Sequence, residues 1–131
     1  MPVQYIYAYL LALVVYAVID FVWLGLIGRG LYVSEMGDAL RPDLNWAAAV
    51  AFYLVYALGL VFLAISPGVA AKSVMQAASA GAVLGLVAYG TYDLTGLAVL
   101  KGFSTRIALV DLAWGTLLSA AVAAGVTKIL T

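Results

Sequence analysis

Residues 15–30 read VYAVIDFVWLGLIGRG, an apolar segment interrupted by a single carboxylate, Asp20. With the residues before it, this segment forms one apolar run from about residue 3 to residue 27. A helix that crosses a bilayer needs roughly 20 such residues, so the run predicts a membrane span. An acid inside a span costs about 2.5–3.5 kcal/mol on insertion scales, and it therefore indicates a function or a binding partner.

The composition of the whole chain agrees with a membrane protein. Hydrophobic residues make up 67% of the 131 residues and charged residues 9%, whereas soluble domains are about half apolar and a quarter charged. Six basic and six acidic residues cancel, so no positive field for nucleic acid is expected. The chain has no Cys and no His, which excludes disulfides and removes the commonest transition-metal ligand.

Three further apolar runs cover about residues 46–65, 74–100 and 107–129. Backbone groups in lipid must bond within their own segment, so each run is predicted to be a helix. SPGVAAK (66–72) and KGFST (101–105) are short enough to be turns. Short turns make neighbouring helices antiparallel. The sequence therefore predicts an all-α membrane protein, one antiparallel four-helix bundle over residues 1–131.

The connection GRGLYVSEMGDALRPDLN (28–45) is longer and holds five of the twelve charges. Tyr32, Met36 and Leu40 recur every four residues in it, which favours a short amphipathic helix on the membrane surface. Ser34 is predicted to cap this helix and Pro42 to end it. A solvated loop is the alternative, and the sequence leaves both open.

Basic residues set the predicted orientation, because cytoplasmic loops are enriched in them. Four lie on the side of loop 28–45 and two on the opposite side: Arg29, Arg41, Lys101 and Arg106 against Lys72 and Lys128. This favours loops 28–45 and 101–105 in the cytoplasm and both termini outside.

Three acids lie within the spans: Asp20, Asp93 and Asp111. At 1.5 Å per residue they lie about 13, 12 and 8 Å from the same basic edge. The sequence thus predicts one layer of acids, contributed by the first, third and fourth helices, that binds a proton, a cation or a substrate. The second helix, which carries no charge, is interpreted as scaffold. No cofactor is predicted, and a cation at the acid layer stays open.

Aromatic residues accompany the acids at helical spacing, and they are assigned to the same site: Tyr16, Tyr89, Tyr92, Trp23 and Trp114. Asp-x-x-Trp occurs at 20–23 and again at 111–114. The first and fourth helices are antiparallel in the predicted bundle. The two indole rings are therefore expected on opposite sides of the acid layer.

Small residues follow the acids on the third and fourth helices. GAVLG (81–85) matches the GxxxG pattern through Gly81 and Gly85, and Gly115 and Ser119 share a face with Asp111. Residues of this size let membrane helices approach closely. The spacing also arises easily in spans rich in Ala and Gly, so a role limited to packing is the alternative.

An internal similarity connects the first and third helices. YAVIDFVWL (16–24) and YGTYDLTGL (89–97) share Tyr-x-x-x-Asp followed by Leu four residues later. Such a similarity is typical of a parallel repeat, here of helix pairs 1–2 and 3–4. The second and fourth helices show no matching pattern.

Three ionised acids at low dielectric would repel one another, so something must relieve the repulsion. One interpretation is ion pairing with Arg29, Lys101 and Arg106, which lie near the same edge. The other is a shared proton or a bound cation. The sequence does not separate them.

The segments YDLTGLAVLKGF (92–103) and LVDLAWG (109–115) resemble a family of small bacterial integral-membrane proteins known as a domain of unknown function. The resemblance covers the whole chain, including DFVWLG (20–25), and departs from the family pattern at Gly96, where Asn is usual. It implies four helices in a bacterial inner membrane and no settled activity. The matching positions are Tyr92, Asp93, Leu94, Thr95, Leu100, Lys101, Gly102, Val110, Asp111, Trp114 and Gly115.

Three functions are consistent with four spans and a layer of acids. The first is proton- or cation-coupled transport of a small solute, or a channel, in a homo-oligomer such as a dimer, because one small bundle has little interior volume. The second is an accessory subunit of a larger membrane complex. The third is a membrane enzyme acting on lipids, since paired carboxylates can perform acid–base catalysis. Transport is the interpretation that the acid layer favours.

Overall fold

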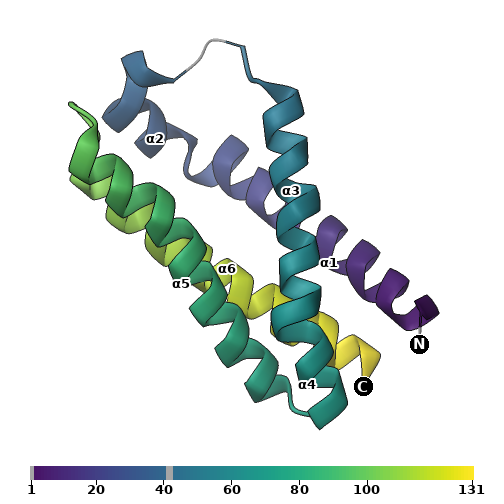
Figure 1. Cartoon of the computed structure of the whole chain (residues 1–131). Coiled ribbons are helices and arrows are strands. Elements are labelled where there is room, and N and C mark those ends of the chain that lie inside the picture. The colour runs from purple at the N-terminus through teal and green to yellow at the C-terminus, as the bar shows by residue number, and fades with distance from the viewer. Residues whose placement is uncertain (1, 41–42) are drawn as a thin grey trace.

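The computed structural model describes residues 2–40 and 43–131, and all the regular elements in these ranges are helices. Four helical segments are long and apolar enough to cross a membrane: Val3–Ile27, Trp46–Ala71, Val74–Val99 and Thr105–Leu130. The predicted all-α bundle of four spans is confirmed. Both termini lie at the same end of the bundle, as an even number of spans requires (Figure 1).

The first span changes its helix type near the acid. It consists of α1 (Pro2–Val22) and a π-helical segment, η1 (Trp23–Ile27). The Gly28 N–H donates to the Trp23 carbonyl at 2.6 Å. A Cβ on Gly28 would lie 2.9 Å from the Trp23 ring, so the indole occupies the space that a side chain would need.

After Gly28 the chain forms α2 (Arg29–Met36) and a short 3₁₀ helix, η2 (Gly37–Ala39). A short helix was predicted here, but the prediction that Ser34 caps it is wrong. The N-cap is Gly28, while Ser34 lies within α2 and its hydroxyl donates to the Leu31 carbonyl at 3.0 Å. Arg41 and Pro42 lie outside the described residues.

The second span is longer than predicted. It comprises α3 (Trp46–Leu60), a π-helical segment η3 (Val61–Ile65) and α4 (Ser66–Ala71). The prediction of a turn over residues 66–72 is therefore wrong: the helix ends only at Lys72, whose φ is 53°. Pro67 would lose a hydrogen bond and clash in a regular helix. The wider π-turn before it, in which the Ser66 N–H donates to the Val61 carbonyl, lets the helix continue.

The third and fourth spans, α5 (Val74–Val99) and α6 (Thr105–Leu130), form a long antiparallel hairpin (Figure 1). Ser73 and Ser104 cap them by accepting backbone N–H groups at 3.0 and 3.1 Å. A Cβ on Gly81 would lie 2.6 Å from the Ser119 carbonyl oxygen, and one on Gly85 would collide with the Gly115 carbonyl. The small residues thus lie where the two backbones come closest.

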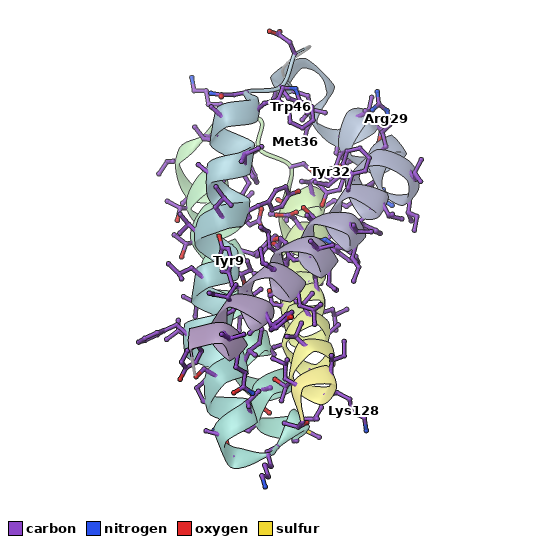
Figure 2. All side chains as sticks on the ribbon, turned by 90° about the vertical axis from the view of Figure 1, so that its right-hand side faces the viewer. Tyr9, Arg29, Tyr32, Met36, Trp46 and Lys128 are labelled. Carbon is purple, nitrogen blue, oxygen red and sulfur yellow. The ribbon has the colours of Figure 1, made fainter. Side chains whose placement is uncertain are left out.

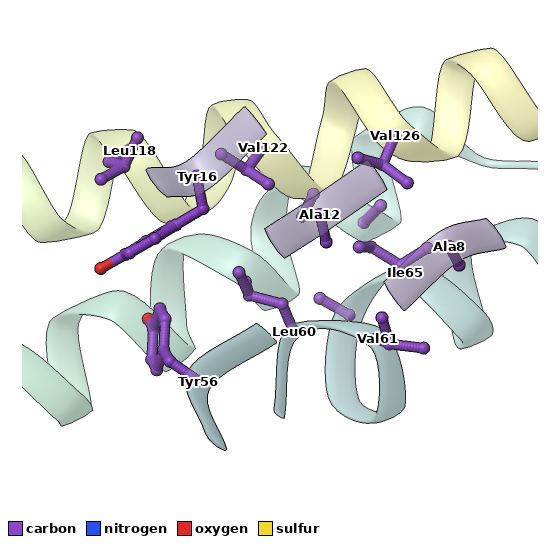
Figure 3. Close-up of a cluster of buried hydrophobic side chains, with 13 residues drawn as sticks. Ala8, Ala12, Tyr16, Tyr56, Leu60, Val61, Ile65, Leu118, Val122 and Val126 are labelled. Carbon is purple, nitrogen blue, oxygen red and sulfur yellow. The ribbon is translucent and has the colours of Figure 1, made fainter. Parts of the chain in front are cut away.

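Around this hairpin, α1 packs against α6 and α3, whereas the second span meets α5 mainly through η3 and α4. The apolar core fills the half of the bundle nearer the termini. Figure 3 shows this cluster, which includes Leu60, Ile65, Val122 and Val126. The acids of the spans lie in the other half, next to α2.

Candidate functional site

Asp20 is the most completely hydrogen-bonded of the three acids. It lies near the end of α1 with 5% of its surface exposed. Its carboxylate accepts a hydrogen bond from the Tyr53 hydroxyl at 2.6 Å and another from Trp114 Nε1 at 2.9 Å. Neutral donors from α3 and α6 therefore hold this acid between three spans.

Asp93 has an unusual environment for an acid. Its side chain on α5 is 0% exposed, and within the described part of the chain neither carboxyl oxygen receives a hydrogen bond from a donor. The neighbouring acidic side chain is that of Asp111 on α6. Two carboxyl groups can bond to each other only if one of them carries a proton. The arrangement fits a pair with one shared proton.

Asp111 connects this pair to α2. It accepts a hydrogen bond from the Tyr32 hydroxyl at 2.8 Å, and that hydroxyl in turn accepts one from Trp23 Nε1 at 3.2 Å. Tyr32 belongs to α2, beyond the first span, and Figure 2 shows it nearer the middle of the bundle than Arg29. Burial raises the pKa of the Tyr32 hydroxyl, and the charge of Asp111 raises it further. Tyr32 therefore remains a donor at neutral pH.

The indole rings of Trp23 and Trp114 are stacked, with centroids 4.7 Å apart and an interplanar angle of 15°. The prediction that they lie on opposite sides of the acid layer is wrong. That prediction assumed that the three acids lie at the same depth in the membrane. Asp111 in fact lies nearer than Asp20 to the membrane edge that carries the basic residues. At 1.5 Å per residue, Trp23 lies about 9 Å and Trp114 about 12 Å from that edge, a separation that two indole rings easily span.

The three acids do not form a single cluster. Asp93 and Asp111 are neighbours, and Asp20 lies within electrostatic reach of Asp111 but has its own hydrogen-bond donors. Among the described residues, no three acid, His or Cys side chains come together in a way that could hold a metal ion. The site therefore consists of a carboxyl pair and a separate carboxylate, which the stacked indoles connect.

The predicted tyrosines occupy different places. Tyr16 and Tyr89, the equivalent residues of the internal similarity, meet through their hydroxyl groups beneath the acids. Tyr16 also packs on Tyr53 and Tyr56, with ring centroids 5.7 and 5.2 Å away. Tyr92 does not join them: it is 63% exposed and packs edge-on against Phe103.

The structure does not bring the predicted basic partners to the acids. The side chains of Arg29, Lys101 and Arg106 are exposed. The donors to Asp20 and Asp111 are instead phenol and indole groups. Negative charge in this half of the bundle is therefore relieved by hydrogen bonds and by the pairing of acids.

Sequence reasoning missed the part played by the second span and by α2. Tyr53 donates to Asp20, Tyr56 pairs with the buried Ser119 at 2.7 Å, and Tyr32 reaches Asp111. Two tyrosines three residues apart in a span without charge were the available signal for Tyr53 and Tyr56. Tyr32 stood out only as one member of an amphipathic pattern.

Comparison with known proteins places the chain in a family. The sequence pattern of the family described as "Predicted membrane protein (DUF2177)" matches residues 5–127, which include most of each of the four spans and all three acids. Neither the curated proteins nor the solved structures gave a match. With the match spanning nearly the whole chain, the protein belongs to this family of predicted membrane proteins, DUF2177.

Proposed function

We propose that this protein is a proton-coupled transporter of a small solute and that Asp93 and Asp111 form its proton-binding site. The observation that carries the proposal is the environment of Asp93, which is 0% exposed and has no hydrogen-bond donor among the described residues. A buried unpaired carboxylate costs several kcal/mol. A proton held between Asp93 and Asp111 removes that cost. Its loss and return would alter the packing between α5 and α6.

Ionisation of the pair has a defined structural consequence. When the shared proton leaves, two adjacent carboxylates repel each other at low dielectric. The tight contact of α5 with α6 lies directly below them, at Gly85 and Gly115. A second cation, either a solute or an inorganic ion, would restore the balance. Exchange of a proton for a cation is the elementary step of a coupled transporter.

The test combines a spectroscopic measurement with a flux measurement. Infrared difference spectra of the purified protein should contain a protonated carboxyl band that Asp93→Asn removes. In proteoliposomes, a pH gradient should drive proton flux that Asp93→Asn and Asp111→Asn abolish. Asp43→Asn, which changes an exposed acid outside the spans, is the matched control. Flux that is unchanged in Asp20→Asn, Asp93→Asn and Asp111→Asn would refute the transport proposal.

The membrane orientation and oligomeric state belong to the same proposal. We propose that the protein lies in the bacterial inner membrane. The balance of basic residues supports an orientation with α2 and residues 101–105 in the cytoplasm and both termini outside. Because the chain has no Cys, single cysteines introduced near Arg29 and Lys128 can be labelled selectively. Figure 2 shows these two residues at opposite ends of the bundle. Light scattering in detergent would test the proposed dimer, and a stoichiometric partner would favour an accessory subunit instead.

A membrane enzyme is the second candidate, and the carboxyl pair is the observation that favours it. Two acids with one proton between them can supply a general base and a general acid. The complete burial of Asp93 argues against it, because a substrate atom would need to reach the pair. Turnover of a lipid ester by the purified protein, lost in Asp93→Asn, would favour this candidate over transport.

A further inference from the structure

An apolar groove opens from the lipid side of the first span beside the stacked indoles. Its volume is about 210 Å³, and its walls are almost entirely apolar: Val18, Ile19, Val22, Trp23, Ile27 and Trp114. These residues belong to two membrane-spanning segments. A molecule in the groove would therefore be in the hydrocarbon region and in contact with two aromatic rings.

The two indoles that line the groove also reach the acids behind them. Trp114 Nε1 donates to the Asp20 carboxylate at 2.9 Å, and Trp23 Nε1 donates to Tyr32, which donates to Asp111. An indole that donates its N–H to a carboxylate has negative charge at the edge of its electron-rich ring. The groove is thus apolar in its lining and negative in its electrostatic surroundings.

The charges in the interior of the spans, away from the terminal turns, are all negative. The interior of the spans holds Asp20, Asp93 and Asp111, whereas the basic residues within them lie in terminal turns, Arg106 at the start of α6 and Lys128 in its last turn. At the depth of the groove no basic residue of the described spans offsets the acids. An anionic solute would be repelled there, and a neutral one would not benefit from the field.

We infer that the groove is the solute site of the proposed transporter and that its ligand is a lipophilic organic cation. The cation would lie against the indole rings of Trp23 and Trp114, whose electron density attracts positive charge. Its apolar substituents would contact Val18, Ile19 and Val22. The inference rests on the proposed function, because it supplies the cation that exchanges with the shared proton.

Binding of the cation should depend on pH, because the cation and the proton are linked through the same acids. A cation near Asp20 and the acid pair binds better when the acids are ionised, and by reciprocity its binding favours release of the proton. Affinity should therefore fall as the solution becomes acidic. The acid bonded to the lining of the groove is Asp20, through Trp114 Nε1, and the Tyr53 hydroxyl bonds to the same carboxylate without adding charge. Arg29, two residues beyond the lining residue Ile27, has an exposed side chain.

The experiment uses two probes of the same shape and opposite charge, tetraphenylphosphonium and tetraphenylborate. Calorimetric titration of the full chain in detergent should give saturable binding of the phosphonium ion, weaker at acidic pH, and none of the borate ion. Trp114→Leu and Asp20→Asn should each weaken phosphonium binding by about tenfold, the loss of one desolvated cation–π or charge contact.

Matched variants keep the result clear if these two fail to fold. Val18→Phe should fill the groove from the lipid side and abolish binding, whereas Val55→Phe, at an exposed site on α3, should not. Trp46→Leu removes the remaining tryptophan, which is 61% exposed and outside the groove, and should leave the affinity unchanged.

Equal binding of both probes would overturn the inference, and so would a loss of affinity in Trp46→Leu as large as that in Trp114→Leu. Either result would indicate partition into the micelle or binding at a lipid site. If the phosphonium ion does not bind while the carboxyl band of Asp93 persists, the inference fails and the proton site stands. If Asp93→Asn leaves the infrared spectrum and the proton flux unchanged, the proposed function fails first.

Discussion

At the scale of single residues, Tyr53 holds the carboxylate of Asp20 from a helix that has no charge of its own. Tyr53→Phe removes the shorter of the two hydrogen bonds to this carboxylate. Loss of a bond to a buried charged group should lower the free energy of unfolding by about 1–3 kcal/mol. Titration with a denaturing detergent measures it, and Tyr5→Phe, an exposed tyrosine on α1, should change nothing comparable. Equal losses in both variants would contradict the role given to Tyr53.

Gly85 lies where the backbones of α5 and α6 come closest, and its replacement tests this contact. A Cβ there would collide with the Gly115 carbonyl and lie 2.7 Å from Ser119 Oγ, whereas a Cβ on Gly125 would meet nothing within 4 Å. Overpacking of a tight contact costs about 1–3 kcal/mol. Gly85→Ala should therefore destabilise the protein, and Gly125→Ala should not. Thermal unfolding monitored by circular dichroism distinguishes them, and the prediction fails if the two midpoints agree.

At the scale of elements, the π-helical segment η1 positions Trp23 against Trp114, and Gly28 leaves space for it. Gly28→Ala should displace the Trp23 indole and separate the stacked rings. Stacked indoles give an exciton signal in the near-ultraviolet circular dichroism spectrum, and this signal should disappear. Gly30→Ala, where a Cβ meets nothing within 4 Å, is the control and should keep it.

The sequence predicted the features that depend on hydropathy, such as the four spans. It did not predict the features that depend on the detailed geometry of the helices. Four apolar runs predicted four spans because lipid leaves the backbone no alternative to helices. Pro67 suggested a helix end, but a π-turn that no local pattern revealed let the helix continue. The stacking of Trp23 on Trp114 depended on an axial offset of a few ångströms between two helices. The bond from Tyr53 to Asp20 depended on how α3 is rotated, which a uniformly apolar segment does not record.

At the scale of the whole molecule, the packing is uneven. α5 and α6 are in contact along their length. The second span, in contrast, contacts α5 mainly through η3 and α4 and much less through α3. Hydrogen exchange measured by mass spectrometry should therefore be slowest in α5 and α6 and faster in α3, because amide protection follows local packing. Faster exchange in residues 81–96 than in residues 46–60 would contradict this view of the bundle.

The apolar cluster in Figure 3 closes the bundle below the acids. Leu60, Ile65, Val122 and Val126 are each at most 2% exposed, so this half forms a hydrophobic seal between the site and the far leaflet. In the proposed transport, a solute admitted beside α2 would reach a blind end, and its release on the other side would require these side chains to part. The slow step of a transport cycle would then be the opening of this seal, and its rate would rise steeply with temperature.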